Sequence, residues 1–248
     1  MVAEYISKMV RRSPPIACSV VNYSTPVVAF GNARTVHLAT LGINPSTREF
    51  VDPVSGDLLR NAKQRLENLK SLGASDCVSL SDEMLEKVVF ACDNYFNANP
   101  YTKWFRRLDK IIKFGSETSY FDQTACHLDL SQWATSLVWG NLSPEQRNRL
   151  LADGRDHLEA QLVREKISTV VVNGRTVWDA LFRGDFCTVR EQKEIMLGTS
   201  GDLRAFAITA EGLGVRFFGW TCNVQSSRGI TNEDCNLLAR WLRSSLER

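Results

Sequence analysis

The feature that most constrains the fold is an uncharged run from Val36 to Gly42, which is followed by Ile43-Asn44-Pro45-Ser46. Such a run suits a strand buried on both faces of a parallel sheet. Gly42 permits a turn, and Pro45 cannot continue a hydrogen-bonded ladder. Asn44 is therefore expected at the carboxyl end of the strand, where open α/β sheets bind their ligands. The alternative is an ordinary turn, since Asn-Pro is a common loop dipeptide.

Further apolar runs alternate with segments of helical spacing. Strands are expected at 124–130, 169–174 and 215–220, with 203–209 pairing at a sheet edge. Helices are expected near 58–72, 82–94, 102–114, 144–165, 174–182 and 232–246, after a short helix and extension in residues 1–35. This alternation predicts a three-layer α/β/α sandwich with a central, mainly parallel four-stranded sheet, in one domain over residues 1–248.

Composition excludes several other classes of protein. The hydrophobic content of 44% over 248 residues is enough for a sizeable core, and the net charge of +2 does not by itself indicate a polyanion partner. The 7 cysteines never form a C-x-x-C pair, which argues against a disulfide framework, a zinc ribbon or a cysteine-bound cluster. No apolar run approaches the length of a membrane helix. We expect a soluble cytoplasmic protein without a metal or other cofactor.

Residues 95–107 combine aromatic, amide and basic side chains. Aromatic rings can stack on bases while Lys103, Arg106 and Arg107 reach phosphates, so this segment is a candidate DNA-binding surface. The alternative is that Trp104 and Phe105 belong to the core, as aromatic residues at helical spacing usually do.

Three segments together resemble the uracil-DNA glycosylase superfamily. They are the strand that ends in Gly-Ile-Asn-Pro-Ser, the middle strand with Asp129 near its end, and the final strand, which leads into Asn223-Val224-Gln225-Ser226-Ser227-Arg228-Gly229. The resemblance covers roughly residues 30–245 in order and spacing. It implies that the first motif positions a water, the middle strand reads a flipped base, and the last motif grips the DNA backbone and wedges into the duplex.

The chain departs from that family at its catalytic positions. Uracil-specific members have Gly-Gln-Asp-Pro-Tyr in the first motif, so Asn44 stands in place of a carboxylate. Asparagine is not a strong base; Asn44 is expected to orient water in a dissociative reaction. Asn223 stands where the family often has a histidine, and its amide can donate one hydrogen bond to the departing base. Ser226, Ser227 and Arg228 are expected to contact phosphates, with Arg228 as the wedge; the alternative is a plain surface loop.

Two further positions concern the base. Asp129 stands near the family's base-reading asparagine, and an ionised carboxylate accepts from the N4 amine of cytosine but opposes the O4 of uracil. The alternative is that Asp129 caps a turn or pairs with an arginine. Ser46 replaces the bulky tyrosine that closes the pocket beside C5, which leaves room for a C5 substituent, unless Phe50 or Tyr95 closes the pocket instead.

The sequence therefore predicts a monofunctional DNA glycosylase that hydrolyses the N-glycosidic bond of a flipped pyrimidine and leaves an abasic site. The expected base is a C5-modified cytosine, such as glucosylated hydroxymethylcytosine in phage DNA, because the resemblance extends to superfamily members that act in phage defence. DNA is the expected partner, and we expect a monomer. The alternatives are a uracil or mismatch repair glycosylase and a non-catalytic DNA-binding relative.

Overall fold

A computed structural model describes residues 2–199 and 201–248. The chain divides into two compact units that are interleaved in sequence. The first unit comprises Met1–Asn32, Ile43–Tyr101 and Leu128–Gln161, and the second comprises Ala33–Gly42, Thr102–His127 and Leu162–Arg248. Each unit has its own packing and its own polar cluster.

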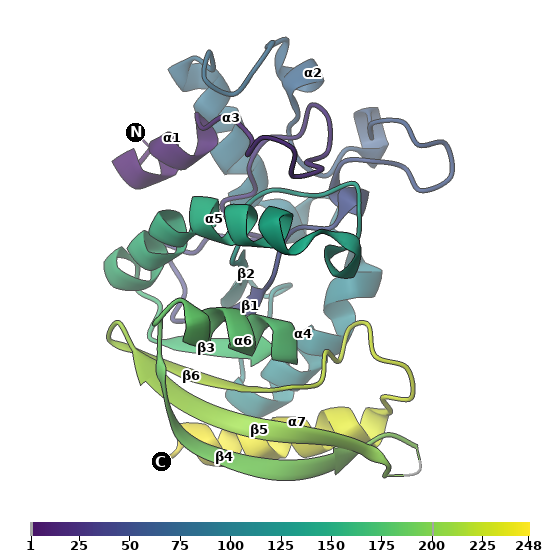
Figure 1. Cartoon of the computed structure of the whole chain (residues 1–248), viewed down its shortest axis with the longest axis vertical. Helices are drawn as coiled ribbons and strands as arrows, with labels where there is room; N and C mark the ends of the chain where they lie inside the picture. Colours follow the sequence, from purple (N-terminus) through teal and green to yellow (C-terminus); the bar gives the residue numbers. More distant parts are fainter. Residues whose placement is uncertain (1, 200) are drawn as a thin grey trace. The chain divides into compact units, whose positions relative to one another are not determined.

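Six strands form one mixed sheet in the order β2-β1-β3-β6-β5-β4 (Figure 1). The strands are β1 Leu38–Gly42, β2 Ala125–Asp129, β3 Thr169–Asn173, β4 Thr188–Leu197, β5 Leu203–Gly212 and β6 Val215–Trp220. β1 pairs with β3 and β3 with β6 in parallel, whereas β5 pairs antiparallel with both β6 and β4. The α/β class is confirmed, but the prediction of four strands is wrong.

The two additional strands form a hairpin whose outer strand carries little sequence signal. In β4 the residues from Thr188 to Glu194 are all exposed, and most of them are polar or charged, so the strand shows no apolar alternation. The strand is defined instead by its backbone pairing with β5. The predicted segment 203–209 does pair with the sheet as β5, but β4 is the edge strand. An exposed charged edge is how natural sheets avoid pairing with other chains.

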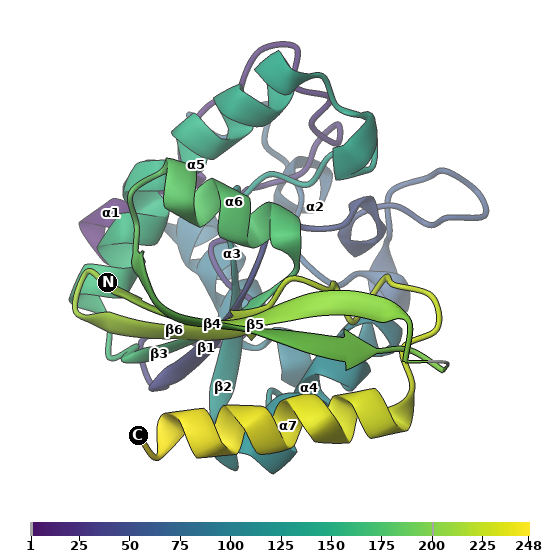
Figure 2. The ribbon, with the colours of Figure 1, turned by 60° about the horizontal axis from the view of Figure 1, so that its bottom comes forward.

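Helices of the second unit lie on both faces of the sheet. Figure 2 shows α6 on one face and α4 and α7 on the other. These helices are α4 Thr102–Ser116, α6 Arg175–Arg183 and α7 Asn232–Leu246. α7 begins at a capping box, in which the Thr231 side chain accepts from Asp234 N, and its predicted bounds are confirmed. The carboxyl ends of the parallel strands β3 and β6 lead into Gly174 and into the loop after Trp220.

The first unit is mainly helical and irregular chain. Its α-helices are α1 Glu4–Val10, α2 Leu69–Leu72, α3 Asp82–Asp93 and most of α5 Pro144–Arg164, and its short 3-10 helices are η1 Thr47–Glu49, η2 Asn61–Lys63, η3 Tyr95–Asn97 and η4 Trp139–Asn141. None of the helices in the described residues is both long and apolar enough to cross a membrane.

The predicted helix over 58–72 is wrong except for its last turn. Asn61 has a left-handed φ of 53°, and Asn68 caps α2 by accepting from Lys70 N and Ser71 N. A left-handed residue interrupts a helix, and a capping asparagine starts one, so the helix begins eleven residues later than predicted. Gly73 ends it with a left-handed φ of 67°, as the sequence predicts.

Candidate functional site

Asn44 belongs to the first unit and comes two residues after the last residue of β1, Gly42, as predicted. Its Nδ2 donates to Trp133 O at 3.3 Å, to Thr135 Oγ1 at 3.1 Å and to Pro45 O at 3.1 Å. Among residues 2–199 and 201–248, nothing donates to its Oδ1, and the side chain is half-buried. This hydrogen-bond network fixes which amide atom is the nitrogen. The amide is anchored through its nitrogen, and its oxygen is available to accept a hydrogen bond from a water.

The segment that anchors Asn44 is itself tightly held. Trp133 Nε1 donates to Asp153 Oδ2 at 2.8 Å, and Ser131 N donates to Ile43 O at 3.0 Å. At Gly154 in α5, a Cβ atom would overlap the carbonyl oxygen of Leu130, so only glycine lets the helix approach this backbone so closely. The acceptors around Asn44 are therefore fixed before any ligand binds.

Asp129 is the last residue of β2 and is only 5% exposed. Its backbone carbonyl accepts from Gln132 Nε2 at 2.9 Å, which ties the strand end to the segment that anchors Asn44. The Asp129 charge also contributes to raising the pKa of Glu49, so the two carboxyl groups are neighbours. The structure thus brings Asp129 and the loop after Asn44 into one cluster.

Ser46 and Phe50 lie at the two ends of η1 in that loop. The Ser46 hydroxyl accepts from Arg48 N at 3.2 Å and caps the short helix. Phe50 is 1% exposed and Tyr95 is fully buried, so neither ring has an open face on which a base could stack. Of these side chains, only that of Ser46 is both small and half-buried.

Glu49 is a residue that the sequence gives no reason to select. It is 1% exposed, and Tyr95 Oη donates to its Oε2 at 2.6 Å. Burial raises the pKa of Glu49 to about 7, and the neighbouring Asp129 adds to this, whereas Tyr95 and Arg65 oppose it. In sequence it is one acid in a polar loop, and only its place directly before a buried phenylalanine could have drawn attention to it.

A second cluster lies in the second unit, where Asn173 at the end of β3 holds the loop 223–229. Asn173 Oδ1 accepts from Val224 N at 3.0 Å and from Trp220 Nε1 at 3.0 Å. Its Nδ2 donates to Asn223 Oδ1 at 3.1 Å and to Gln225 Oε1 at 2.9 Å. Both lone pairs of Oδ1 and both N–H donors of Nδ2 are therefore used within the protein, so this buried amide fixes the start of the loop.

The Asn223 amide is held through its oxygen, whereas the Asn44 amide is held through its nitrogen. Its Oδ1 accepts from Asn173 Nδ2, from Gln225 N at 3.0 Å and from Ser226 N at 3.2 Å. No acceptor for its Nδ2 exists in the part of the chain that the structure describes. Gly174, with a φ of 108°, passes so close that a Cβ there would lie 3.2 Å from the Asn223 Cβ. Asn223 therefore presents an N–H donor, and its donation to a departing base stays a prediction.

The predicted phosphate contacts lie near this loop. Gln225 Nε2 donates to Trp104 O at 3.1 Å and Arg107 Nη1 donates to Val224 O at 2.7 Å, so the loop packs on the start of α4. On α4 Lys103 and Arg106 are exposed, and on the loop Ser226 and Arg228 are exposed and Ser227 is half-buried. Phe105, in contrast, is 1% exposed and belongs to the core, and Trp104 is half-buried.

We expect Arg228→Ala to weaken binding to DNA of any sequence and to reduce the salt dependence of binding by about one phosphate contact, because Arg228 is exposed on this loop. The measurement is duplex affinity against salt concentration for two unrelated sequences. Lys193→Ala on exposed β4 is the matched loss of one positive charge, and it should leave the slope unchanged. Equal slopes for Arg228→Ala and wild type would remove the loop from the DNA interface.

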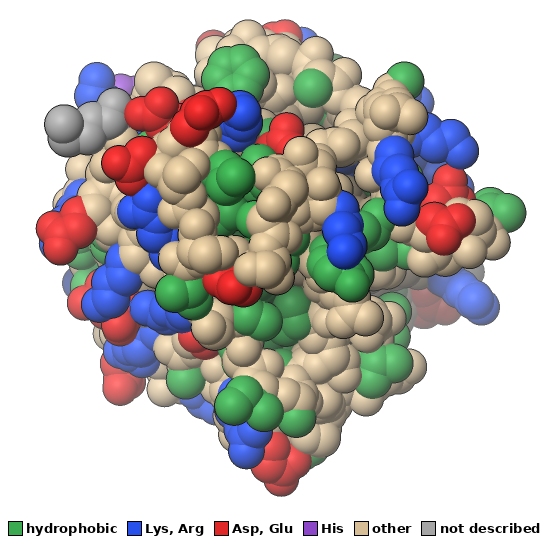
Figure 3. Space-filling model, turned by 90° about the horizontal axis from the view of Figure 1, so that it is seen from above, with side chains coloured by type: hydrophobic (Ala, Val, Ile, Leu, Met, Phe, Trp, Pro, Cys, Tyr) green, Lys and Arg blue, Asp and Glu red, His purple; other side chains and the backbone are tan. Residues whose placement is uncertain are grey.

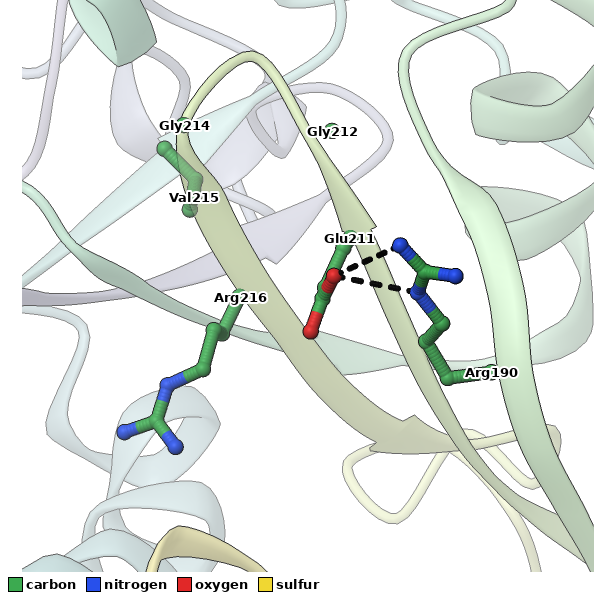
Figure 4. Close-up of a pocket in the computed structure, with 6 residues that line it drawn as sticks. All are labelled: Arg190, Glu211, Gly212, Gly214, Val215 and Arg216. Carbon is green, nitrogen blue, oxygen red and sulfur yellow. Dashed lines mark hydrogen bonds and ion pairs between the residues drawn. The ribbon is translucent and has the colours of Figure 1, made fainter.

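A pocket of about 420 Å³ at the β5–β6 turn lies apart from the predicted residues in sequence. It is lined by Arg190, Glu211, Gly212, Gly214, Val215 and Arg216. Arg190 and Glu211 form an ion pair in this pocket (Figure 4), with Arg190 Nη2 at 2.9 Å from Glu211 Oε2. Two of the three charged side chains that line the pocket therefore neutralise each other. None of the predicted site residues lines this pocket.

Comparisons with known proteins add no assignment: no protein-family model matches the chain, and none of the curated proteins is significantly similar to it. Among the described residues, there is no group of three or more His, Cys, Asp or Glu side chains that could hold a metal ion.

Proposed function

We propose that the chain is a monofunctional DNA glycosylase that hydrolyses the N-glycosidic bond of a flipped pyrimidine and leaves an abasic site. The observation that carries this proposal is the Asn44 amide, whose nitrogen makes three hydrogen bonds and whose oxygen is left to accept one from a water. The proposal includes the finer fold, a uracil-DNA glycosylase-like α/β/α sandwich in which the β4–β5 hairpin extends the sheet. It needs no cofactor, and it treats the protein as a cytoplasmic monomer.

The proposed chemistry relies on positioning more than on acid–base catalysis. Asn44 Oδ1 accepts from the nucleophilic water and orients it, but an amide cannot remove its proton to any large extent. The glycosidic bond therefore stretches first, and the positive charge on the sugar is stabilised by the DNA phosphates before water adds. Asn223 Nδ2 donates to the oxygen on which negative charge develops as the base leaves. An N–H from a neutral amide is a weaker donor than a charged histidine.

The proposed base is a C5-modified cytosine, for example glucosylated hydroxymethylcytosine in phage DNA. Asp129 at the end of β2 supports a cytosine-type base, because an ionised carboxylate only accepts hydrogen bonds. Ser46 supports a C5 substituent, because its small side chain is used to cap η1 and adds no ring at this position. A uracil or mismatch repair enzyme is the second candidate, which Asn44 permits and Asp129 disfavours. A non-catalytic DNA-binding relative is the third.

The deciding experiment is detection of free base by mass spectrometry after incubation with DNAs that contain uracil, cytosine, hydroxymethylcytosine or its glucosylated form. Release from the modified cytosines supports the proposal, and preferential release of uracil supports the repair enzyme. Alkali cleaves DNA at abasic sites, so the absence of both base release and alkali-sensitive cleavage on every substrate would indicate the non-catalytic relative.

We expect Asp129→Asn to shift preference toward uracil, because an asparagine can donate to O4 where a carboxylate meets only lone pairs. A lost or repulsive hydrogen bond costs about 1–3 kcal/mol, which corresponds to a change of roughly five- to 150-fold in the ratio of the two rates. The measurement is the ratio of single-turnover rates on matched uracil and cytosine-type substrates. The control is Asp156→Asn, which makes the same change at an exposed position of α5. Asp153 is unsuitable as a control because it accepts a hydrogen bond from Trp133 Nε1. An unchanged ratio would mean that Asp129 does not read the base.

A further inference from the structure

Arg65 in the first unit has an unusual environment for a charged side chain. The side chain is only 20% exposed, and its Nε is fully buried without a hydrogen-bond partner. The nearest carboxylate atom, Glu49 Oε2, lies 3.9 Å from Nε, which is too far for a hydrogen bond. Within the described chain, no atom accepts a hydrogen bond from this guanidinium group. A charged donor without a hydrogen bond is costly to keep in a partly buried place, and Glu49 offsets this only through its charge at 3.9 Å. A ligand that accepts from the exposed part of the guanidinium group would lower that cost.

A second guanidinium group lies beside the same aromatic ring. The Cζ atoms of Arg48 and Arg65 lie 5.7 and 5.6 Å from the centre of the Tyr101 ring. Arg48 is exposed, and its Nη1 donates to Tyr101 Oη at 2.8 Å. Tyr101 is fixed in turn, because its backbone N donates to Tyr95 Oη at 2.8 Å. Two positive charges are thus held at one preorganised ring.

We infer that Arg48, Tyr101 and Arg65 form a binding site for a phosphate group, and that its occupant is a phosphodiester of the DNA strand being processed. The inference rests on the proposed function for the choice of DNA. A guanidinium group presents a planar fork of N–H donors that matches phosphate oxygens, and stacking on an aromatic ring leaves the edge of that fork available. Arg48 also belongs to the loop that begins at Asn44, so the site places a phosphate contact on the loop that carries the proposed water.

The distribution of charged side chains on the face shown in Figure 3 favours a phosphate site made by a few residues over a broad basic surface. Lys and Arg side chains on this face are interspersed with Asp and Glu side chains, so no broad basic field covers it. With a net charge of +2, affinity for DNA must come from a few built contacts rather than from the overall charge.

Glu49 makes this site sensitive to pH. The charged and titratable groups that act on Glu49 are Tyr95 on η3, Arg65 and Asp129 on β2. The pKa of Glu49 is raised to about 7, so near neutral pH its negative charge competes with a phosphate for Arg65. Below this pH Glu49 is neutral, and phosphate binding should tighten. By linkage, a bound phosphate should raise the pKa of Glu49 further.

The test measures binding by fluorescence anisotropy with a labelled duplex of A·T pairs only, which contains no proposed substrate base. Arg65→Gln and Arg48→Gln should each lower the affinity by about tenfold and reduce the salt slope by about 0.9. Arg48 is exposed, so its variant tests the site even where Arg65→Gln disturbs folding, which circular dichroism reports. Lys193→Gln, a matched charge loss on β4, should bind with the wild-type slope. Wild-type slopes for both arginine variants would overturn the inference.

Two further arms separate the possible explanations. Inorganic phosphate, added at constant ionic strength, should compete only weakly; competition as strong as that of unlabelled duplex would overturn DNA as the occupant. Glu49→Gln should bind equally at pH 6 and pH 8.5, whereas the wild type should bind more weakly at the higher pH; identical pH profiles would overturn the coupling. Base release is scored separately. Altered slopes without base release on any substrate reject the glycosylase but support the phosphate site, and base release with unaltered slopes rejects the site alone.

Discussion

Replacing Asn44 by alanine is expected to lower the single-turnover rate of base release by ~100-fold or more while leaving DNA affinity nearly unchanged. The reason is that in the proposed mechanism the Asn44 oxygen holds the water, whereas an uncharged amide contributes little to the affinity for DNA phosphates. The measurement is release of free base under single-turnover conditions, with binding of the same duplex measured in parallel. A fall in rate without a fall in affinity is the signature of a group that acts on the reacting water.

The control for this experiment is Asn148→Ala, which removes the same side chain from an exposed position of α5. Thr135→Val is a second informative variant, because it removes one of the three acceptors that anchor Asn44 Nδ2 and should give a smaller loss. If Asn44→Ala retains the wild-type rate, Asn44 does not take part in the reaction. If instead the variant loses rate and affinity together, its effect is on the loop rather than on the water.

Replacing Glu49 by glutamine is expected to stabilise the fold by about 3 kcal/mol above neutral pH and to have no such benefit under acidic conditions. Burial raises the pKa of Glu49 from 4.5 to about 7, so folding favours the protonated form. Below about pH 4.5 the carboxyl is protonated in both states and costs nothing. Between about pH 4.5 and 7 the carboxyl ionises in the unfolded state but stays protonated in the folded state, so stability falls as pH rises; above 7 the folded state also holds the charge, and the loss is complete. Glutamine carries no charge and can still accept from Tyr95 Oη.

The measurement is the free energy of unfolding in urea for both proteins at several values between pH 4.5 and pH 8. The difference between them should grow with pH and level off above about 7. Glu83→Gln is the control, because Glu83 is exposed on α3 and its pKa is lowered by the hydrogen bond and the charge of Lys87. The control should show no such gain in stability as pH rises. A difference between wild type and Glu49→Gln that is independent of pH would mean that Glu49 is already ionised throughout this range.

Local sequence was sufficient where burial and end signals are local. The apolar runs locate β1, β2, β3 and β6 because a strand covered on both faces is apolar along most of its length; the charged residues within them are Asp129 at the end of β2 and the exposed Arg216 of β6. The positions of Ser81 and Gly73 locate helix ends because capping depends on a few adjacent residues. Asn44 follows β1 as predicted, because Gly42 permits a turn and Pro45 cannot donate a ladder hydrogen bond.

Only the tertiary structure decided the features that depend on partners distant in sequence. β4 is almost wholly exposed and exists because β5 pairs with it, so its own residues carry no strand pattern. Glu49 and Arg65 look like ordinary charged loop residues, yet one is buried against Tyr95 and the other lies beside Tyr101 without a hydrogen bond. The atom that each of the two anchored amides presents is likewise set from far along the chain, by Trp133 and Thr135 for Asn44 and by Asn173 for Asn223. Residue type and spacing determine which groups are available, but burial and hydrogen bonding across the fold determine which of their atoms can react.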